Sequence, residues 1–203
     1  MVDMNEYLAG IQPKTVLEDR VKMFLQTTKF FHDSNKSNSG FALDAMEQAK
    51  VVSARLRSKD EKDPSVPSAT VIFEITCANN VLNPMGSMHG GCVATLYDNL
   101  STYSVAVLEK YWDEFDPAKE NLENYAVKFI NKVQPDMGVS RQLQVIYLRA
   151  LVPGQKVFME VNLVSSSKRF ATYTARMYDE QGRVYSTMTH DKAKTEPGRV
   201  SKL

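Results

Sequence analysis

One stretch, residues 83–98, limits what this chain can fold into more than any other part of it. It opens with turn-forming residues and reaches a pair of glycines, Gly90 and Gly91. A largely apolar run without glycine or proline then continues over residues 92–108. The length and composition of this run predict a helix that begins near the glycine pair and ends near Lys110.

Two features distinguish this helix from one that only fills a core. The first N–H groups of a helix lack backbone partners and carry about half a positive charge, so they bind phosphates and developing oxyanions. Gly90 and Gly91 would leave these groups unshielded. Asp98 falls within the apolar face, where a carboxylate is costly unless it is paired or used. We therefore expect an anion or oxyanion site. The alternative is a tight turn before a core helix in which Asp98 is hydrogen-bonded.

The same stretch holds turn, helix-start and mid-helix residues at a fixed spacing: Asn83, Gly86, His89, Gly90, Gly91, Ala94, Asp98 and Asn99. This set resembles the hotdog-fold acyl-CoA thioesterases, and most of all their small PaaI-type and THEM-type members. The match is strong over residues 83–101 and continues more weakly, through its strand pattern, over residues 142–194. The resemblance implies the hotdog fold, an antiparallel sheet wrapped around a long central helix.

The resemblance also implies roles in hydrolysing acyl-CoA to a carboxylic acid and CoA. The Gly90 N–H, with Gly91 beside it, would hold the thioester carbonyl oxygen as charge develops, and His89 would support this turn. Asp98 would act as general base toward water or as nucleophile, and Asn83 would orient the water or the carbonyl. No cofactor is expected, because CoA is part of the substrate. Without the resemblance, His89 equally suits a turn residue that bonds its own backbone.

Substrate-binding residues are harder to place. The resembling enzymes often have Ser or Thr at the end of the strand after the helix, and the nearest position here is Arg149. Either another group positions the water, or Arg149 binds a CoA phosphate. CoA carries three phosphates, so we also expect a basic lip, with Lys168 and Arg169 at a turn and Lys192 and Lys194 at the end of the last strand. Ordinary solvated charge is the alternative for each of these residues.

The rest of the chain predicts an α+β protein. An amphipathic helix is expected over residues 13–31, starting at a capping box, Thr15-x-x-Glu18, and a short helix over 41–48. Alternating apolar residues predict strands over 52–56, 71–77, 142–147, 157–163, 170–177 and 184–194. Val52 is expected on the inner face of the first strand. Residues 111–139 suit a strand or a short helix, either as a cap over the acyl pocket or as a surface insertion.

These elements divide the chain into three parts. We expect an N-terminal helical extension over residues 1–48, the hotdog domain over 49–195 and a flexible tail over 196–203. One long helix among at least five antiparallel strands is an α+β architecture. The tail ends in Ser201-Lys202-Leu203, the tripeptide that the peroxisomal import receptor reads. This predicts a peroxisomal enzyme of lipid metabolism, and a cytoplasmic one if the tripeptide is a coincidence.

Composition excludes some partners. Lys and Arg number 25 against 24 Asp and Glu, so charge gives no reason to expect nucleic acid or an anionic membrane as a partner. No apolar stretch of about 18 residues predicts a membrane span. Cys77 and Cys92 suit free thiols in a reducing compartment, and the three histidines lack the spacing of a metal site.

Two other functions remain open at this point. A cysteine hydrolase could use Cys92, which falls in the first helical turn, where a thiol pKa is lowered, and which follows His89 closely. No third orienting group is evident for that pair. A non-catalytic acyl-CoA-binding protein of the same fold is the other alternative, and the presence of Asp98 and Asn83 argues against it.

Helix geometry predicts an assembly. Gly90 and Asp98 are eight residues apart, which on a helix is about 12 Å along the axis. A thioester carbonyl and its attacking water lie only about 3–3.5 Å apart. One helix therefore cannot supply both groups to one bond, whereas two antiparallel helices related by a two-fold axis can. We expect a homodimer with two shared sites, or a tetramer that is a dimer of such dimers.

Overall fold

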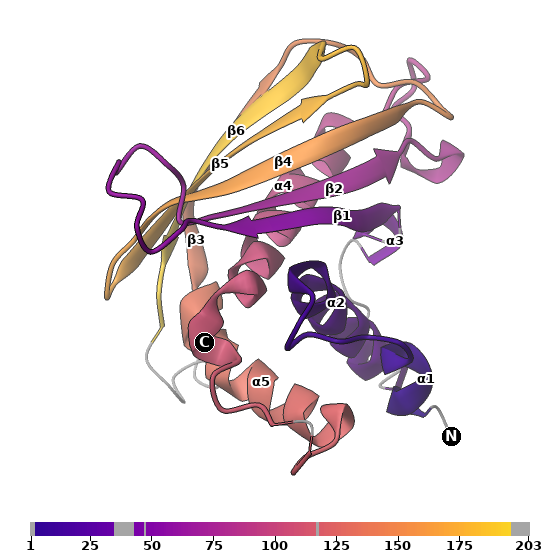
Figure 1. Ribbon diagram of the computed structural model, residues 1–203. Coiled ribbons are helices and arrows are strands. Elements are labelled where there is room, and N and C mark those ends of the chain that lie inside the picture. The colour runs from indigo at the N-terminus through magenta and orange to yellow at the C-terminus, as the bar shows by residue number, and fades with distance from the viewer. Residues whose placement is uncertain (1–2, 35–42, 47, 117, 196–203) are drawn as a thin grey trace.

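Six antiparallel strands form one sheet in the order β1-β2-β4-β5-β6-β3 (Figure 1). They are β1 (Ala49–Leu56), β2 (Ala69–Thr76), β3 (Val139–Tyr147), β4 (Lys156–Ser166), β5 (Phe170–Tyr178) and β6 (Val184–Ala193). The computed structural model describes residues 3–34, 43–46, 48–116 and 118–195. All six predicted strands are confirmed, and the first two form the antiparallel hairpin that their alternation suggests.

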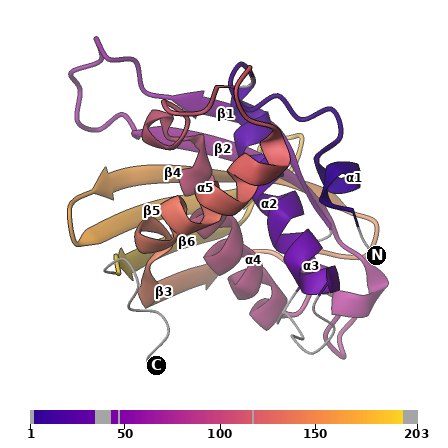
Figure 2. The same cartoon turned by 90° about the horizontal axis from the view of Figure 1, so that it is seen from below.

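The sheet curves over helix α4 (Gly90–Tyr103), which lies against its inner face (Figures 1 and 2). Val93, Leu96 and Leu100 of this helix are buried in the main apolar cluster, which also contains the fully buried Val71 and Phe73 of β2. The predicted central helix and the α+β hotdog architecture are therefore confirmed. The helix buries one apolar stripe, and the sheet buries every second residue of its strands.

The central helix ends earlier than predicted. Two short 3₁₀ helices, η2 (Ser104–Val107) and η3 (Glu109–Tyr111), take the place of its last two turns. The hydroxyls of Ser101 and Thr102 donate to the Asp98 carbonyl at 3.1 and 2.7 Å, and that of Ser104 donates to the Leu100 carbonyl at 2.8 Å. Such bonds compete with the helical backbone ladder and favour its ending here.

Two details of the N-terminal part differ from the expectation. Helix α2 (Leu17–Ser34) starts two residues after Thr15, the predicted N-cap. Glu18 accepts a hydrogen bond from the Ala54 N–H at 2.9 Å, so it connects α2 to β1. Val52 is 45% exposed because a β-bulge between Val51 and Ser53 turns it outward. Helix α1 (Met4–Leu8) was not predicted, and α3 (Leu43–Met46) lies within the predicted range 41–48, of which residues 41, 42 and 47 are outside the described residues.

Residues 111–139 contain helix α5 (Leu122–Met137) and no strand before β3 begins at Val139. Figure 1 shows α5 below the sheet, on the same side as α1 and α2, and α5 contacts both of these helices. These elements share a second apolar cluster, in which Trp112 stacks on Phe129 with ring centroids 5.0 Å apart. Buried Arg20 of α2 joins the same region, because its guanidinium pairs with Glu109 at 3.0 Å. The insertion thus builds a core of its own against the N-terminal helices.

No helix in the described part of the chain is both long and apolar enough to cross a membrane. The predicted targeting tripeptide lies outside the described residues.

Candidate active site

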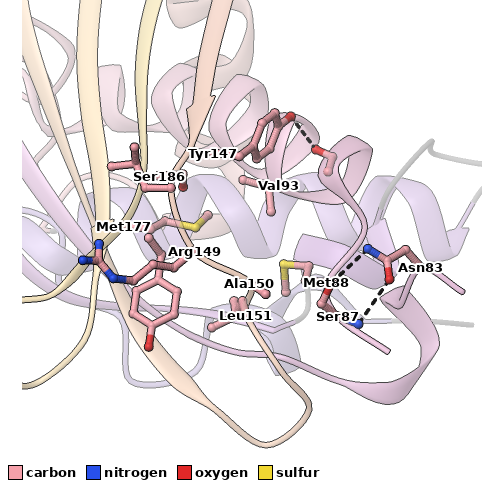
Figure 3. Close-up of a pocket in the computed structure, with 13 residues that line it drawn as sticks. Asn83, Ser87, Met88, Val93, Tyr147, Arg149, Ala150, Leu151, Met177 and Ser186 are labelled. Atoms are coloured by element: carbon pink, nitrogen blue, oxygen red, sulfur yellow. Dashed lines mark hydrogen bonds between the residues drawn. The ribbon is translucent and has the colours of Figure 1, made fainter. Parts of the chain in front are cut away.

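The turn before α4 is held by the side chain of Asn83. Its carbonyl oxygen accepts hydrogen bonds from the N–H groups of Met85 at 2.9 Å and Ser87 at 3.2 Å, and its amide nitrogen donates to the Ser87 hydroxyl at 2.9 Å (Figure 3). Gly86 completes the turn with a φ of 78°, a left-handed conformation that suits glycine. Asn83 therefore shapes the approach to the helix, and it also lines the pocket beside it.

The start of α4 leaves one backbone donor exposed. His89 is the N-cap, and its Nδ1 accepts the Gly91 N–H at 2.9 Å, so the predicted use of Gly91 as a second oxyanion donor is wrong. A Cβ on Gly91 would lie 2.9 Å from that same Nδ1, which explains the glycine. The Gly90 N–H has no hydrogen-bond partner among the described residues, and it remains the donor available to a ligand.

A pocket of about 380 Å³ opens beside Gly90, between the start of α4 and the adjoining ends of β3 and β6 (Figure 3). Its wall includes the apolar side chains of Met88, Val93, Leu151 and Met177. Tyr147 stands at the Gly90 side, where its hydroxyl donates to the Gly90 carbonyl at 2.8 Å. Apolar walls next to a free backbone donor suit an acyl group whose carbonyl must be held.

Arg149 lies on the side of this pocket away from α4, and Figure 3 shows its guanidinium pointing away from that helix. It donates to the Val184 carbonyl. Strand β3 pairs antiparallel with β6, with Ser140 opposite Lys192 near one end and Tyr147 opposite Ser186 at the other. Arg149 follows Tyr147, so it is remote from Asp98 and does not occupy the position of a water-holding hydroxyl.

The hydroxyl that does lie beside Asp98 is that of Ser140, which sequence reasoning missed. The Ser140 hydroxyl donates to Asp98 Oδ1 at 2.8 Å, across 42 residues of chain. The Asp98 side chain is 42% exposed, so its carboxylate remains open on one side. Ser140 stands at the beginning of β3, not at its end, and it follows the insertion that contains α5. A sequence signal existed, since Ser140 is the only serine or threonine in residues 139–147.

Beneath this pair lies a buried histidine. The ring of His190 places Nδ1 2.8 Å from the Ser101 hydroxyl and Nε2 3.0 Å from the Ser140 hydroxyl and 3.3 Å from Asp98 Oδ1. Complete burial, with Lys192 nearby, lowers the pKa of His190 to about 4, so the ring is neutral at pH 7. A neutral ring donates from one nitrogen and accepts at the other. With the proton on Nε2, His190 donates to Ser140 and Ser140 donates to Asp98 Oδ1. The single Ser101 proton then goes either to Nδ1 or to the Asp98 backbone carbonyl, and a chain from Ser101 to Asp98 forms when it goes to Nδ1.

The predicted basic lip does not assemble around the pocket within one chain. Lys192 is buried, with Nζ 2.8 Å from the Thr102 hydroxyl, and Lys194 pairs with Asp136 at 2.7 Å. Lys168 and Arg169 lie in the turn between β4 and β5, at the opposite end of β5 from the pocket residue Met177. The expectation for Lys192 is therefore wrong, and Lys168 and Arg169 belong to the end of the sheet where Ser140 lies.

Cys92 lacks the properties of a nucleophile. Burial raises its pKa to about 11, so it is a thiol at neutral pH, and it packs against the main apolar core. The Nδ1 of His89, the nearest histidine in sequence, is occupied by the Gly91 N–H. Cys92 and Cys77 are both free. This geometry removes the basis for the cysteine hydrolase alternative.

An antiparallel sheet wrapped around α4 defines a hotdog-fold protein. The family model of the thioesterase superfamily matches residues 85–186, which is half of the chain, and the protein therefore belongs to that superfamily. The matched range includes Gly90, Asp98 and Ser140. The resemblance seen in the sequence is thereby confirmed. No curated protein matches the chain as a relative.

Solved structures agree on the fold. Thioesterase superfamily member 2 of zebrafish has a TM-score of 0.59 at 18% identity, with 89% of this chain and 99% of that chain covered. The PaaI protein of the E. coli phenylacetic acid degradation operon has a TM-score of 0.52 at 12% identity, with 89% and 97% covered. A hypothetical thioesterase of Streptococcus pneumoniae, solved with coenzyme A, has a TM-score of 0.52 at 20% identity, with 83% and 97% covered.

Proposed function

We propose that this protein is an acyl-CoA thioesterase that hydrolyses the thioester to a free carboxylic acid and CoA. The observation that carries the proposal is one helix that presents an unpartnered Gly90 N–H at its start and a Ser140-bonded Asp98 carboxylate further along. Membership of the thioesterase superfamily supports it, and so does the similar fold of a thioesterase solved with coenzyme A.

The reaction assigns a role to each group. The Gly90 N–H donates a hydrogen bond to the carbonyl oxygen and stabilises its negative charge while the carbon becomes tetrahedral. Asp98 takes a proton from a water that Ser140 helps to hold, and the resulting hydroxide adds to the carbonyl carbon. Collapse breaks the C–S bond, and the proton on Asp98 passes to the CoA sulfur. In the alternative route Asp98 itself attacks, and water then hydrolyses the anhydride.

The site we propose is shared between two chains. Gly90 and Asp98 stand on one helix about 12 Å apart along its axis, too far to act on one bond. Strand β3 is an edge of the sheet, and Val139, Ile146 and Tyr147 on it are about half exposed. Pairing of β3 with a second copy would bury this edge and bring Gly90 of one chain toward Asp98 of the other. A homodimer is the minimal assembly, and a tetramer would be two such dimers.

The basic side chains retain a role in this proposal. Arg149 lines the pocket, and Lys168 and Arg169 lie at the Ser140 end of the sheet. In a shared site the Gly90 end of one chain would lie against the Ser140 end of the other. Arg149 of one chain and Lys168 and Arg169 of the other could then contact the phosphates of the same CoA. Asn83 would keep the helix start in shape while His89 caps it.

A turnover assay tests the function. The purified protein is offered a panel of acyl-CoA esters of different chain length and aromatic character, and released CoA thiol is measured with a chromogenic disulfide. Release that is abolished in Asp98→Asn supports the proposal. Binding of the esters without release, measured calorimetrically, would make this a non-catalytic acyl-CoA-binding protein.

Subunit exchange tests the shared site. An Asp98→Asn protein and an Asn83→Ala protein, each inactive, are mixed under conditions that exchange subunits. A mixed dimer then has one intact site and one doubly altered site, so activity should recover toward half of the wild-type value per mixed dimer. If activity stays absent after exchange is proven by mass spectrometry, the whole site lies within one chain.

Localisation to the peroxisome is also part of the proposal. A protein that ends in Ser201-Lys202-Leu203 should reach peroxisomes through the import receptor. Removal of these three residues from an N-terminally tagged protein should leave it in the cytosol. Unchanged localisation would show that the tripeptide is not read.

A further inference from the structure

A buried lysine lies under the proposed catalytic carboxylate. Lys192 faces the interior from β6, and its side chain is 4% exposed. Its ammonium donates to the Thr102 hydroxyl at 2.8 Å and stands 3.9 Å from Asp98 Oδ1. The Thr102 hydroxyl in turn donates to the Asp98 backbone carbonyl at 2.7 Å. Lys192 therefore interacts with Asp98 in two ways: by charge with its carboxylate, and through the Thr102 hydroxyl with its backbone carbonyl.

The surrounding charges leave Asp98 as the counter-ion. A buried ammonium is costly unless a carboxylate compensates it, and among the described residues Asp98 is the only carboxylate within ion-pair distance of Lys192. Burial lowers the pKa of Lys192, and the charge of Asp98 opposes that effect. On the same strand His190 is neutral at pH 7, and Asp191 bonds the Thr172 hydroxyl at 2.6 Å. Tyr173 of β5 faces the His190 ring at 6.2 Å, and burial raises its pKa.

All contacts to the carboxylate converge on one oxygen. Ser140 at 2.8 Å, His190 at 3.3 Å and Lys192 at 3.9 Å approach Oδ1 of Asp98. No hydrogen bond or ion pair to Oδ2 is found among the described residues. One oxygen is thus anchored, and the other is left without a partner among the described residues on a side chain that is 42% exposed.

We propose that Lys192 is a positioning residue for Asp98, whose ammonium compensates the carboxylate charge from beneath and keeps Oδ2 directed at the substrate. The proposal rests on the proposed thioesterase function. It assigns the ammonium no contact with substrate, so its effect should show in the pH dependence of the reaction. A positive charge within about 4–6 Å of a carboxyl group generally favours its ionised form and so lowers its pKa.

The first experiment measures kcat/KM against pH for wild type, Lys192→Met and Lys194→Met. Methionine matches the apolar stem of lysine and removes the ammonium with its charge. In Lys192→Met the positive charge beside the carboxylate is gone, so the acid limb should move to higher pH. Lys194 is the matched control, because its ammonium pairs with Asp136 and not with Asp98. An acid limb that stays in place in Lys192→Met, or that moves equally in Lys194→Met, overturns the proposal.

The second experiment needs no activity and separates failure of this proposal from failure of the proposed function. The melting temperatures of wild type, Asp98→Asn, Lys192→Met and the double variant form a cycle at pH 7. Asp98→Asn leaves the buried ammonium without a counter-ion, so the double variant should lose clearly less than the sum of the single losses. Strictly additive losses would show that the two charges are not coupled. If Lys192→Met does not fold alone, a folded double variant supports the coupling, and a double variant that is also unfolded counts against it.

Discussion

Helix α4 presents two functional regions, the Gly90 end at its start and the Asp98 end in its second half, and they are built in opposite ways. At its start, Asn83, Ser87, His89 and Gly91 satisfy one another over nine residues of chain. Around Asp98, the contacts come from Ser140 on β3 and from His190 and Lys192 on β6. The first end offers a backbone N–H, and the second offers a side chain held by distant strands.

This difference predicts where substitutions matter. A backbone donor is set by the local turn, so side-chain changes near it should be tolerated as long as Asn83, whose hydrogen bonds hold the turn, is kept. The carboxylate, in contrast, comes from the Asp98 side chain alone, and no neighbouring group can replace it. Its position depends on each of the strands whose residues contact it. Damage should therefore be larger at the Asp98 end than at the Gly90 end.

The largest contrast is expected between Asp98→Asn and Cys92→Ala. The first keeps the shape of the side chain but removes the base, so kcat should fall by about 10²-fold or more. The second changes a residue in the first turn of α4 that is a thiol with a pKa raised to about 11, so most of kcat should remain. Steady-state kinetics on folded proteins measures both. Asp98→Asn activity within a few-fold of wild type would remove Asp98 from the mechanism, and complete loss in folded Cys92→Ala would restore the cysteine alternative.

Serine substitutions at the two ends should give a smaller contrast. Ser140→Ala removes the hydroxyl bonded to the Asp98 carboxylate at 2.8 Å, and a bond to a charged group is worth about 1.5–3 kcal/mol, or about 10- to 100-fold in kcat. Ser87→Ala at the other end leaves Asn83 bonded to the backbone N–H groups of Met85 and Ser87. We expect less than a few-fold loss there. Equal losses in the two variants would contradict the distinction between the ends.

The same difference explains what the sequence could predict. Gly90 and Asp98 could be proposed because a glycine at a helix start and a carboxylate on an apolar helix face each have a direct physical meaning, whereas His89 was proposed through the family resemblance. The strands were found because residues such as Val71, Phe73 and Ile75 alternate and are all buried. Patterns of this kind depend on neighbours in the chain, and they survive insertions elsewhere.

The anchors of Asp98 could not be found in this way. Ser140 lies beyond an insertion whose helix α5 was not recognised, so the register of β3 against α4 was unknown. Lys192 looked like a surface charge at a strand end, and only the pairing of β6 with β3 and β5 shows that it faces inward. The prediction that Val52 faces inward was wrong for a similar reason. A β-bulge reverses the side of the sheet to which the following residue points, and nothing in the composition indicates the bulge.

The smallest expected effect concerns stability at the Asp98 end. His190 has a pKa of about 4 in the folded protein, below its usual value of about 6.5 in an unfolded chain. Between these pH values the unfolded chain binds a proton that the folded chain does not, so the free energy of unfolding rises with pH. The stabilisation is complete above about pH 6.5 and is lost as the pH falls toward 4.

Replacement of the imidazole by an amide tests this directly. In His190→Gln no proton can bind in that range, so the free energy of unfolding from urea titrations should fall less steeply between pH 6.5 and pH 4 than in wild type. Tyr173→Phe is the control, because Tyr173 faces the His190 ring, and its hydroxyl is buried without a hydrogen-bond partner in the described structure. It alters packing at the same place while His190 still titrates, so it should keep the wild-type slope. Parallel curves for wild type and His190→Gln would mean that His190 does not stay neutral on folding, and the chain from Ser101 to Asp98 would need a charged ring at its centre.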